Sequence, residues 1–342
     1  MTTHNVLVTG GSGFIAGHVI LQLLEQGHGV RATLRSRTKE ASVRAILAES
    51  GMTQGDNLSF VEADLLADDG WAAAVEGVDY VLHVASPVLP GRVENEDDVI
   101  RPAREGTLRV LRAARAAGVK RLVLTSAFHA VSWGHAHSDH IFTEADWTVL
   151  DGPGVDAYGR AKTLAERAAW DLVEAAGGIE LTTMLPVAVM GPVMGADVSG
   201  ANHIVQRMLN GGLPAFPDLY IPIVDVRDVA AAHIAAMTAP GAAGQRFLIS
   251  NGPALAMKQI GAGIRAAVGD AAAKVPTRAM PSLVIRIGAL FNQEFRGTVP
   301  DLGYSKKTSN ERARTELGWT PRPAEQAIAA AAQSMITKGL AG

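Results

Sequence analysis

The chain has 342 residues and 48% of them are apolar, so it can bury a large core, and a disordered or fibrous class is excluded. Its 31 basic residues nearly balance 34 acidic residues without a long basic run, which argues against nucleic-acid and anionic-membrane partners. The absence of cysteine excludes disulfides, thiolate catalysis and cysteine-ligated metals. The N-terminal stretch lacks the pattern of an export signal, and no apolar run reaches membrane-spanning length. We therefore expect a soluble, cytoplasmic protein with a small-molecule partner.

Short β-rich runs alternate with alanine-rich helical stretches in the first half of the chain. The first run, at 5–9, is followed by glycines and by helical periodicity from Ile15 to Gln26. Further strands are predicted at 30–34, 58–63, 79–85, 121–127 and 179–185. This alternation predicts an α/β fold with a doubly wound parallel sheet, because helices must cover both faces of such a sheet.

The sequence changes character after Leu185, where glycine, proline and methionine become frequent. One more apolar segment follows at 221–236, and a short β-rich run at 247–251. We expect a nucleotide-binding domain over 1–185, to which 221–250 returns. The remainder of 186–342 is predicted to form a smaller, interleaved lobe that binds the substrate.

The turn after the first predicted strand, VTGGSGFIAG, has the glycine spacing of a phosphate-binding loop. Gly11, Gly13 and Ala16 fit G-x-G-x-x-G/A, and Gly10, Gly13 and Ala16 fit T-G-x-x-G-x-x-A. Glycine allows a tight turn and a close approach of the backbone, and the free N–H groups at the start of the helix bind an anion. The turn therefore predicts a site for a dinucleotide pyrophosphate.

Arg35 follows the second predicted strand, and Lys39 comes shortly after it. A site specific for NAD tends to carry an acidic residue at the end of this strand, which accepts a hydrogen bond from the ribose 2′-OH. A guanidinium instead matches the geometry of a 2′-phosphate. We predict that the cofactor is NADP(H) and that Arg35 binds its 2′-phosphate.

Tyr158 and Lys162 lie four residues apart in a predicted helix after the fifth strand, so both project from one helical face. A phenol with a pKa near 10 is a poor acid or base at neutral pH. A close ammonium and a cationic nicotinamide ring favour the ionised phenol and lower its pKa. The spacing predicts proton transfer by Tyr158, with Lys162 adjusting its pKa.

Together these motifs resemble the extended short-chain dehydrogenase/reductase family. The similarity rests on TGGSGFIAG, Arg35 after VRATL, Asp64-Leu65, HVASP at 83–87, the Tyr158/Lys162 pair and LPVAVMGP at 185–192. VDVRDVAAAH at 224–233 and SNERARTELGWTPRP at 309–323 extend it over nearly the whole chain. Within the family, the chain is most similar to NADPH-dependent aldehyde and ketone reductases related to dihydroflavonol reductases.

The resemblance implies a Rossmann-type sheet and a reductase that interconverts an aldehyde or ketone with its alcohol. It also implies contacts along the cofactor, from the pyrophosphate and 2′-phosphate to the adenine, the ribose and the nicotinamide. The residues are, in that order, Gly10, Gly13, Phe14 and Ile15; Arg35 and Lys39; Asp64 and Leu65; Ala85 and Ser86; and Thr125, Tyr158, Lys162, Pro186 and Val189. Dimers of the family pair through helices that correspond to 99–117 and 157–175, so either a monomer or a homodimer is expected.

Ala127 is a departure from the family pattern. The family usually has a serine at this position, after the fifth strand, which donates a hydrogen bond to the substrate oxygen. Ser126 or Ser132 could replace it, His129 could act as the donor, or the protein could have lost most of its activity. We favour a working enzyme with Ser126 as the nearest hydroxyl, because the tyrosine and the lysine are present.

Several other residues are expected near the nicotinamide. The predicted substrate contacts, which favour an aryl or alkyl carbonyl but could equally be core residues, are Ala127, Phe128, His129, Trp133, Val187, Met190 and Tyr220. The histidines of GHAHSDH at 134–140 resemble metal ligands, but they lie in a predicted loop without helical spacing. We therefore predict no metal.

Two other functions stay open. One is a nucleotide-sugar epimerase or dehydratase with tightly bound NAD, which Arg35 disfavours because it favours NADP. The other is a non-catalytic protein that senses NADP(H), which Ala127 supports and the Tyr158/Lys162 pair disfavours.

Overall fold

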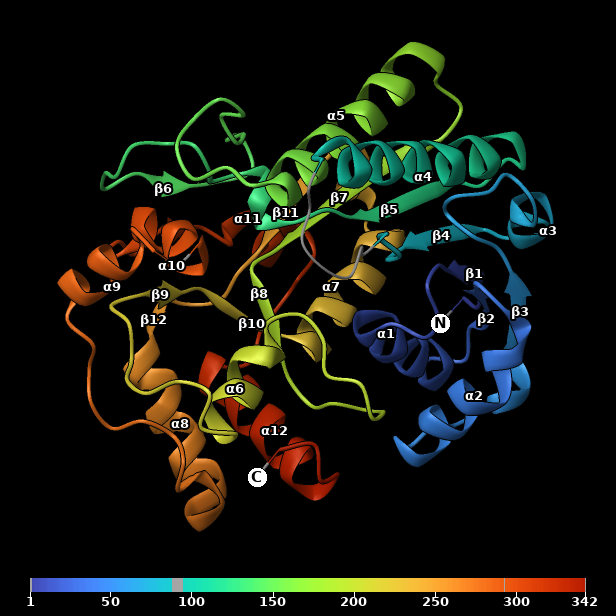
Figure 1. Cartoon of the computed structure of the whole chain (residues 1–342). Coiled ribbons are helices and arrows are strands. Elements are labelled where there is room, and N and C mark those ends of the chain that lie inside the picture. The colour runs from blue at the N-terminus through green and yellow to red at the C-terminus, as the bar shows by residue number, and fades with distance from the viewer. Residues whose placement is uncertain (1, 88–94, 292, 342) are drawn as a thin grey trace.

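The computed structural model describes residues 2–87, 95–291 and 293–341, and its centre is a seven-stranded parallel sheet (Figure 1). The strands pair in the order β3-β2-β1-β4-β5-β7-β11. Their bounds are β1 Asn5–Val8, β2 Gly29–Leu34, β3 Leu58–Glu62, β4 Tyr80–His83, β5 Arg121–Thr125, β7 Glu180–Pro186 and β11 Arg246–Ile249. Five of the strands are buried along nearly their whole length, as expected for a parallel sheet that is covered on both faces.

Helices cover both faces of the sheet. One face carries α1 Phe14–Glu25, α2 Glu40–Glu49 and α7 Val226–Thr238, and the other carries α3 Trp71–Val75, α4 Asp97–Ala116 and α5 Ala157–Ala176. In Figure 1, α4 and α5 lie side by side above the sheet, whereas α1 and α7 lie below it. The predicted doubly wound α/β fold is therefore confirmed.

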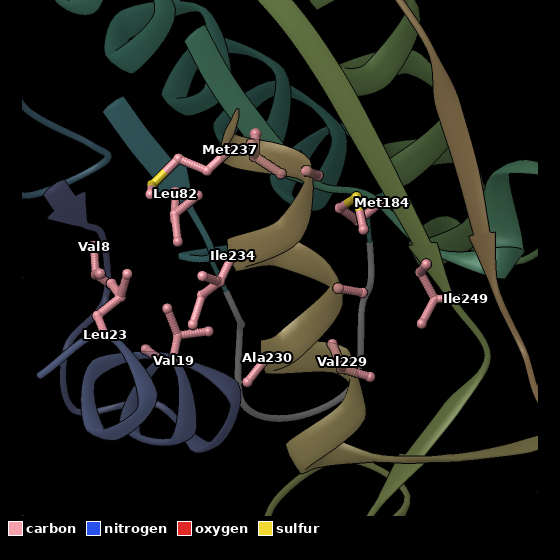
Figure 2. Close-up of a cluster of buried hydrophobic side chains, with 14 of the residues drawn as sticks. Val8, Val19, Leu23, Leu82, Met184, Val229, Ala230, Ile234, Met237 and Ile249 are labelled. Atoms are coloured by element: carbon pink, nitrogen blue, oxygen red, sulfur yellow. The ribbon is translucent and has the colours of Figure 1, made fainter. Parts of the chain in front are cut away.

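The core on the α1 face joins segments that are far apart in the sequence. Figure 2 shows α7 beside α1, with apolar side chains of both helices close to side chains of the strands. The side chains drawn and labelled there are Val8, Val19, Leu23, Leu82, Met184, Val229, Ala230, Ile234, Met237 and Ile249. They explain why the apolar segment predicted at 221–236 belongs to the sheet layer, because its helical part covers the strands.

A smaller lobe is built from the rest of the C-terminal half. Its apolar cluster lies between α6 Asn202–Leu209, α8 Met257–Val268 and α12 Ala324–Thr337. Short strand pairs connect it to the sheet layer, and they comprise β8 Ala188–Met190 with β10 Ile223–Asp225 and β9 Tyr220–Ile221 with β12 Leu255–Ala256. The other short strands and α-helices are β6 Ile141–Phe142, β13 Lys307–Thr308, α9 Ser282–Gly288, α10 Gln293–Thr298 and α11 Glu311–Glu316.

The chain crosses between the two layers more than once. It leaves the sheet after β7, builds β8, α6 and β9, and returns through α7 and β11 before it completes the lobe. The lobe is therefore interleaved with the sheet, as predicted, while its role in substrate binding and the domain boundary at residue 185 stay predictions. No helix in the described part of the chain is both long and apolar enough to cross a bilayer.

Candidate active site

The predicted cofactor residues follow the carboxyl ends of the parallel strands, so they lie along one edge of the sheet. Gly10 follows β1, Arg35 follows β2, Asp64 follows β3 and Ala85 follows β4, while Pro186 ends β7. Crevices at this edge are where open α/β sheets bind their ligands. The order of the strands thus brings Gly10 and Pro186, which are 176 positions apart in the sequence, to the same edge of the sheet.

The glycine turn between β1 and α1 is packed so closely that side chains on Gly10 or Gly11 would collide with neighbouring residues. Gly10 has a φ of +73°, and a Cβ on it would lie 3.1 Å from the Cβ of Ala85. A Cβ on Gly11 would lie 2.8 Å from the Cβ of Ala32. Gly13 is the N-cap of α1, and no described side chain caps it. The first turn of α1, all of which is described, has no acidic residue, so its N–H groups are suited to an anion such as a pyrophosphate.

The three basic residues after β2 differ in their partners. Arg37 is committed to the protein, because its guanidinium donates to the carbonyl of Phe60 at 2.6 Å and pairs with Glu40 at 2.8 Å. The side chains of Arg35 and Lys39 are exposed, and neither has a polar side-chain partner among the described residues. Arg35 is therefore free to meet a 2′-phosphate, which fits the predicted role.

The residues predicted to contact the adenine and the ribose lie in loops after β3 and β4. The Asp64 carboxylate accepts from the backbone N–H of Leu66 at 3.0 Å, and Leu65 is buried. The backbone N–H of Ala85 donates to the Thr9 hydroxyl at 3.0 Å, which fixes the start of the loop that continues through Ser86. The loop residues 88–94 lie outside the described part of the chain.

Lys162 is buried at the carboxyl edge of the sheet, close to the end of β5. Its Nζ donates to the backbone carbonyl of Thr125 at 3.3 Å, and its side chain helps to line a cavity of about 10 Å³ with Ala85 and Ser86. Burial lowers the pKa of Lys162 to about 8, and the carboxylate of Glu166 opposes that shift. The predicted residues Ala85, Ser86, Thr125 and Lys162 therefore come together around one point.

Tyr158 lies in the first turn of α5, one helical turn before Lys162, and 45% of its surface is exposed. Asp156 caps this helix by accepting from the backbone N–H of Gly159 at 2.7 Å. Desolvation around the hydroxyl and the negative charge of Asp156 raise the pKa of Tyr158 to about 12. The lowering expected from Lys162 is thus not found in the protein alone, and Tyr158 holds its proton at neutral pH.

Ser126 has a different partner from the predicted one. Its hydroxyl donates to Glu166 Oε2 at 2.6 Å, and both side chains are buried. A serine has a single O–H donor, so this bond leaves no proton for a substrate oxygen. The geometry therefore disfavours Ser126 as the replacement for the missing serine. Ser132 is also buried, and its hydroxyl has no partner among the described residues.

His129 lies directly against Tyr158. The two rings meet edge to face with their centres 5.0 Å apart, and the imidazole stacks on Trp133 at 3.8 Å with an interplanar angle of 15°. Burial lowers the pKa of His129 to about 4, with further influences from Asp156, Lys306, Asp301 and Lys162. The imidazole is therefore neutral at pH 7.

The predicted substrate contacts separate into two groups. Phe128, Val187 and Met190 are at most 6% exposed and belong to the apolar clusters, so they pack in the core. Ala127 is also buried. Trp133 is partly buried beside His129, and Tyr220 is 36% exposed on β9. Sequence position alone could not separate the two groups, because both consist of apolar or aromatic residues in or near strands and loops.

The histidines of the 134–140 loop have separate partners. His135 bonds the carbonyl of Trp147 at 2.9 Å, His140 bonds Asp146 at 2.9 Å, and His137 stacks on Tyr304. Within the described ranges, no three acidic or histidine side chains are grouped as ligands of one metal ion.

A larger cavity of about 890 Å³ lies elsewhere, between α1, α7 and the C-terminal segment. Its lining includes Gln22, Arg227, Arg322 and Lys338, and none of the predicted catalytic residues. We therefore place the candidate site at the carboxyl edge of the sheet, where the glycine turn, Lys162 and Tyr158 converge.

Two polar groups of the site were not predicted. Lys306, from the C-terminal segment, places its ammonium 3.7 Å from the centre of the Trp133 ring and pairs with Asp301 at 3.1 Å. Glu62, at the end of β3, accepts from the backbone N–H of Arg37 at 3.0 Å, so an acid does lie close to the basic loop. Neither position carries a sequence signal, because both contacts depend on tertiary structure.

Comparisons with known proteins agree with this fold. The model of the NAD dependent epimerase/dehydratase family matches residues 6–250. Tetraketide alpha-pyrone reductase 2 of Arabidopsis thaliana is 35% identical over 247 residues, covering 70% of this chain and 75% of that protein. Cinnamoyl-CoA reductase 1 of the same plant is 33% identical over 246 residues, covering 71% and 69%. The structure of Gre2 from Candida albicans in complex with NADPH superposes with a TM-score of 0.80 at 25% identity, covering 98% and 99%.

Proposed function

The chain belongs to the NAD dependent epimerase/dehydratase family, and we propose that it is an NADPH-dependent carbonyl reductase that interconverts an aldehyde or ketone with its alcohol. The observation that carries the proposal is the pair of Tyr158 and Lys162 on α5, one exposed at the sheet edge and the other buried below it. The similarity to two plant reductases and to Gre2 in complex with NADPH supports it.

The cofactor is NADP(H), and the chain offers residues for each of its charged parts. The N–H groups at the start of α1 would bind the pyrophosphate, and the exposed Arg35 would bind the 2′-phosphate. When bound, the reduced nicotinamide supplies a hydride. Thr125, the predicted neighbour of the nicotinamide, is held by the protein, because its hydroxyl bonds His233 at 2.7 Å and its carbonyl accepts from Lys162.

Tyr158 would donate its proton to the carbonyl oxygen of the substrate as that oxygen gains charge. A phenol with a pKa of about 12 is protonated at neutral pH, so the donor is ready without an external acid. With a pKa of about 8, Lys162 is mostly protonated at pH 7, so its charge stabilises the phenolate that remains.

The test is a panel of aryl and alkyl aldehydes and ketones, with NADPH oxidation followed by absorbance. We expect turnover by the natural chain, and a loss of about 10²–10⁴ in kcat for Tyr158→Phe with unchanged NADPH affinity. Tyr80→Phe is the matched control and should keep full activity, because Tyr80 begins β4 and therefore lies at the opposite edge of the sheet from the candidate site. Turnover of Tyr158→Phe at the natural rate would contradict the proposal.

The same protein sample tests the two other functions. An epimerase or dehydratase would arrive from purification with oxidised NAD bound and would not oxidise NADPH. A sensing protein would bind NADPH in a fluorescence titration but reduce no carbonyl of the panel.

A further inference from the structure

The carbonyl oxygen that Tyr158 would protonate needs a second donor, because a preorganised hydrogen bond to a developing oxyanion is a large term in such reactions. The neighbours on β5 and α5 do not provide one. The Ser126 hydroxyl donates to Glu166, Ala127 has only a methyl group, and the Lys162 ammonium points to the Thr125 carbonyl.

Two neighbours have polar side-chain atoms without a partner among the described residues, but the Ser132 hydroxyl is fully enclosed, which leaves His129. Within the described residues, neither ring nitrogen of His129 makes a hydrogen bond to the protein, and neither is among the fully enclosed polar atoms that lack a partner. Each nitrogen therefore keeps some exposed surface, and the ring that carries both nitrogens lies against Tyr158. At pH 7 the neutral ring carries one N–H donor.

The ring of His129 is held in place by contacts that do not use its nitrogens. It stacks on Trp133, whose ring also contacts the Lys306 ammonium, and Asp301 fixes that ammonium in turn. The backbone carbonyl of His129 accepts from the Thr148 hydroxyl at 2.6 Å. A donor that is held by packing costs little reorganisation when charge develops near it.

We propose that the imidazole N–H of His129 donates a hydrogen bond to the substrate carbonyl oxygen that Tyr158 protonates. The inference rests on the proposed reductase function and assigns its second donor. No bond of the imidazole breaks: the hydroxyl proton of Tyr158 moves to the oxygen, and the N–H of His129 stabilises the charge on that oxygen.

The test compares two substitutions at His129, with a carbonyl that the natural chain reduces. His129→Phe keeps an aromatic ring on Trp133 but removes the donor, whereas His129→Gln keeps an N–H donor. We expect kcat to fall about 10²–10³-fold in His129→Phe, with NADPH affinity and melting temperature unchanged, and to recover at least about tenfold of that loss in His129→Gln. His137→Phe, which alters an exposed stacked histidine of the next loop, is the control and should be fully active.

The outcomes separate the two proposals. If the natural chain reduces no carbonyl, the reductase function fails and this inference fails with it. If the natural chain is active and His129→Phe keeps kcat within about threefold, only the inference is overturned. A fall of His129→Gln to the level of His129→Phe would also overturn it, because a donor would then not suffice.

Discussion

At the scale of single residues, two neighbouring arginines have different predicted roles because their hydrogen-bond and ion-pair partners differ. Arg35 and Arg37 are two positions apart and both are exposed, yet Arg37 bonds Phe60 and Glu40, whereas Arg35 has no polar side-chain partner among the described residues. Removing Arg37 would therefore disturb the loop itself. Removing Arg35 should change only what the loop can bind.

We predict that Arg35→Gln weakens NADPH binding by about 10–100-fold and changes NADH binding by less than about threefold. A charge-assisted hydrogen bond to phosphate contributes about 1.5–3 kcal/mol, and NADH has no phosphate at that position. Fluorescence titrations with both nucleotides measure the two affinities, with the exposed Arg101→Gln on α4 as a control. Equal weakening of both nucleotides would show that Arg35 does not bind the 2′-phosphate.

At the scale of elements, α5 carries the reacting residues and is fixed to the sheet by a buried carboxylate. Glu166 is 1% exposed and accepts from Ser126 on the loop after β5, Thr183 on β7 and Arg246 on β11. The Arg246 guanidinium also donates to the backbone carbonyls of Glu144 and Asp146. One charge thus joins a helix, two strands and two loops.

Glu166→Ala should lower the free energy of unfolding by about 3–5 kcal/mol, because it leaves the buried Arg246 without its partner. Urea unfolding followed by circular dichroism measures the change. Glu174→Ala, an exposed position on the same helix, should stay within about 0.5 kcal/mol of the natural chain. A loss below about 1 kcal/mol in Glu166→Ala would mean that the helix does not depend on this carboxylate.

The network around Glu166 also shows where sequence-based prediction ends. The motifs predicted the glycine turn, the strand ends and the Tyr158/Lys162 spacing, since each is encoded within a few consecutive residues. The hydroxyl of Ser126 could not be assigned, because its partner is 40 residues away and the Arg246 that fixes that partner is 80 residues further. Contacts of that kind depend on strand order, which periodicity does not specify.

At the scale of the whole molecule, the sequence predicts that the sheet is parallel but not the complete order of its strands. Alternating strands and helices predict a parallel sheet, because each element carries its own local pattern. The seventh strand, β11, and its covering helix α7 come after a long excursion into the lobe. The position of that return depends on packing between α7 and α1, which Figure 2 shows and no local motif encodes.

Buried neutral histidines make the whole fold sensitive to acid. His83 and His233 are at most 1% exposed, and burial lowers the pKa of His83 to about 3 and that of His233 to about 4. His18, at 6% exposure, has its pKa lowered to about 4 for the same reason. Between pH 6.5 and these values, the unfolded chain binds protons that the folded chain does not, so stability decreases as the pH falls.

We therefore predict that the free energy of unfolding is constant near pH 7 and falls steadily from about pH 6.5 toward pH 4, by about 3 kcal/mol for each fully buried histidine. Carboxyls such as Asp79 and Asp146 have pKa values below the usual 3.8, so their contribution is lost only at lower pH. Asp228 acts in the opposite direction, because burial raises its pKa. Urea unfolding at half-unit steps of pH measures the profile. A constant free energy of unfolding between pH 7 and pH 5 would contradict the prediction, because it would mean that these histidines bind protons equally well in the folded and the unfolded chain.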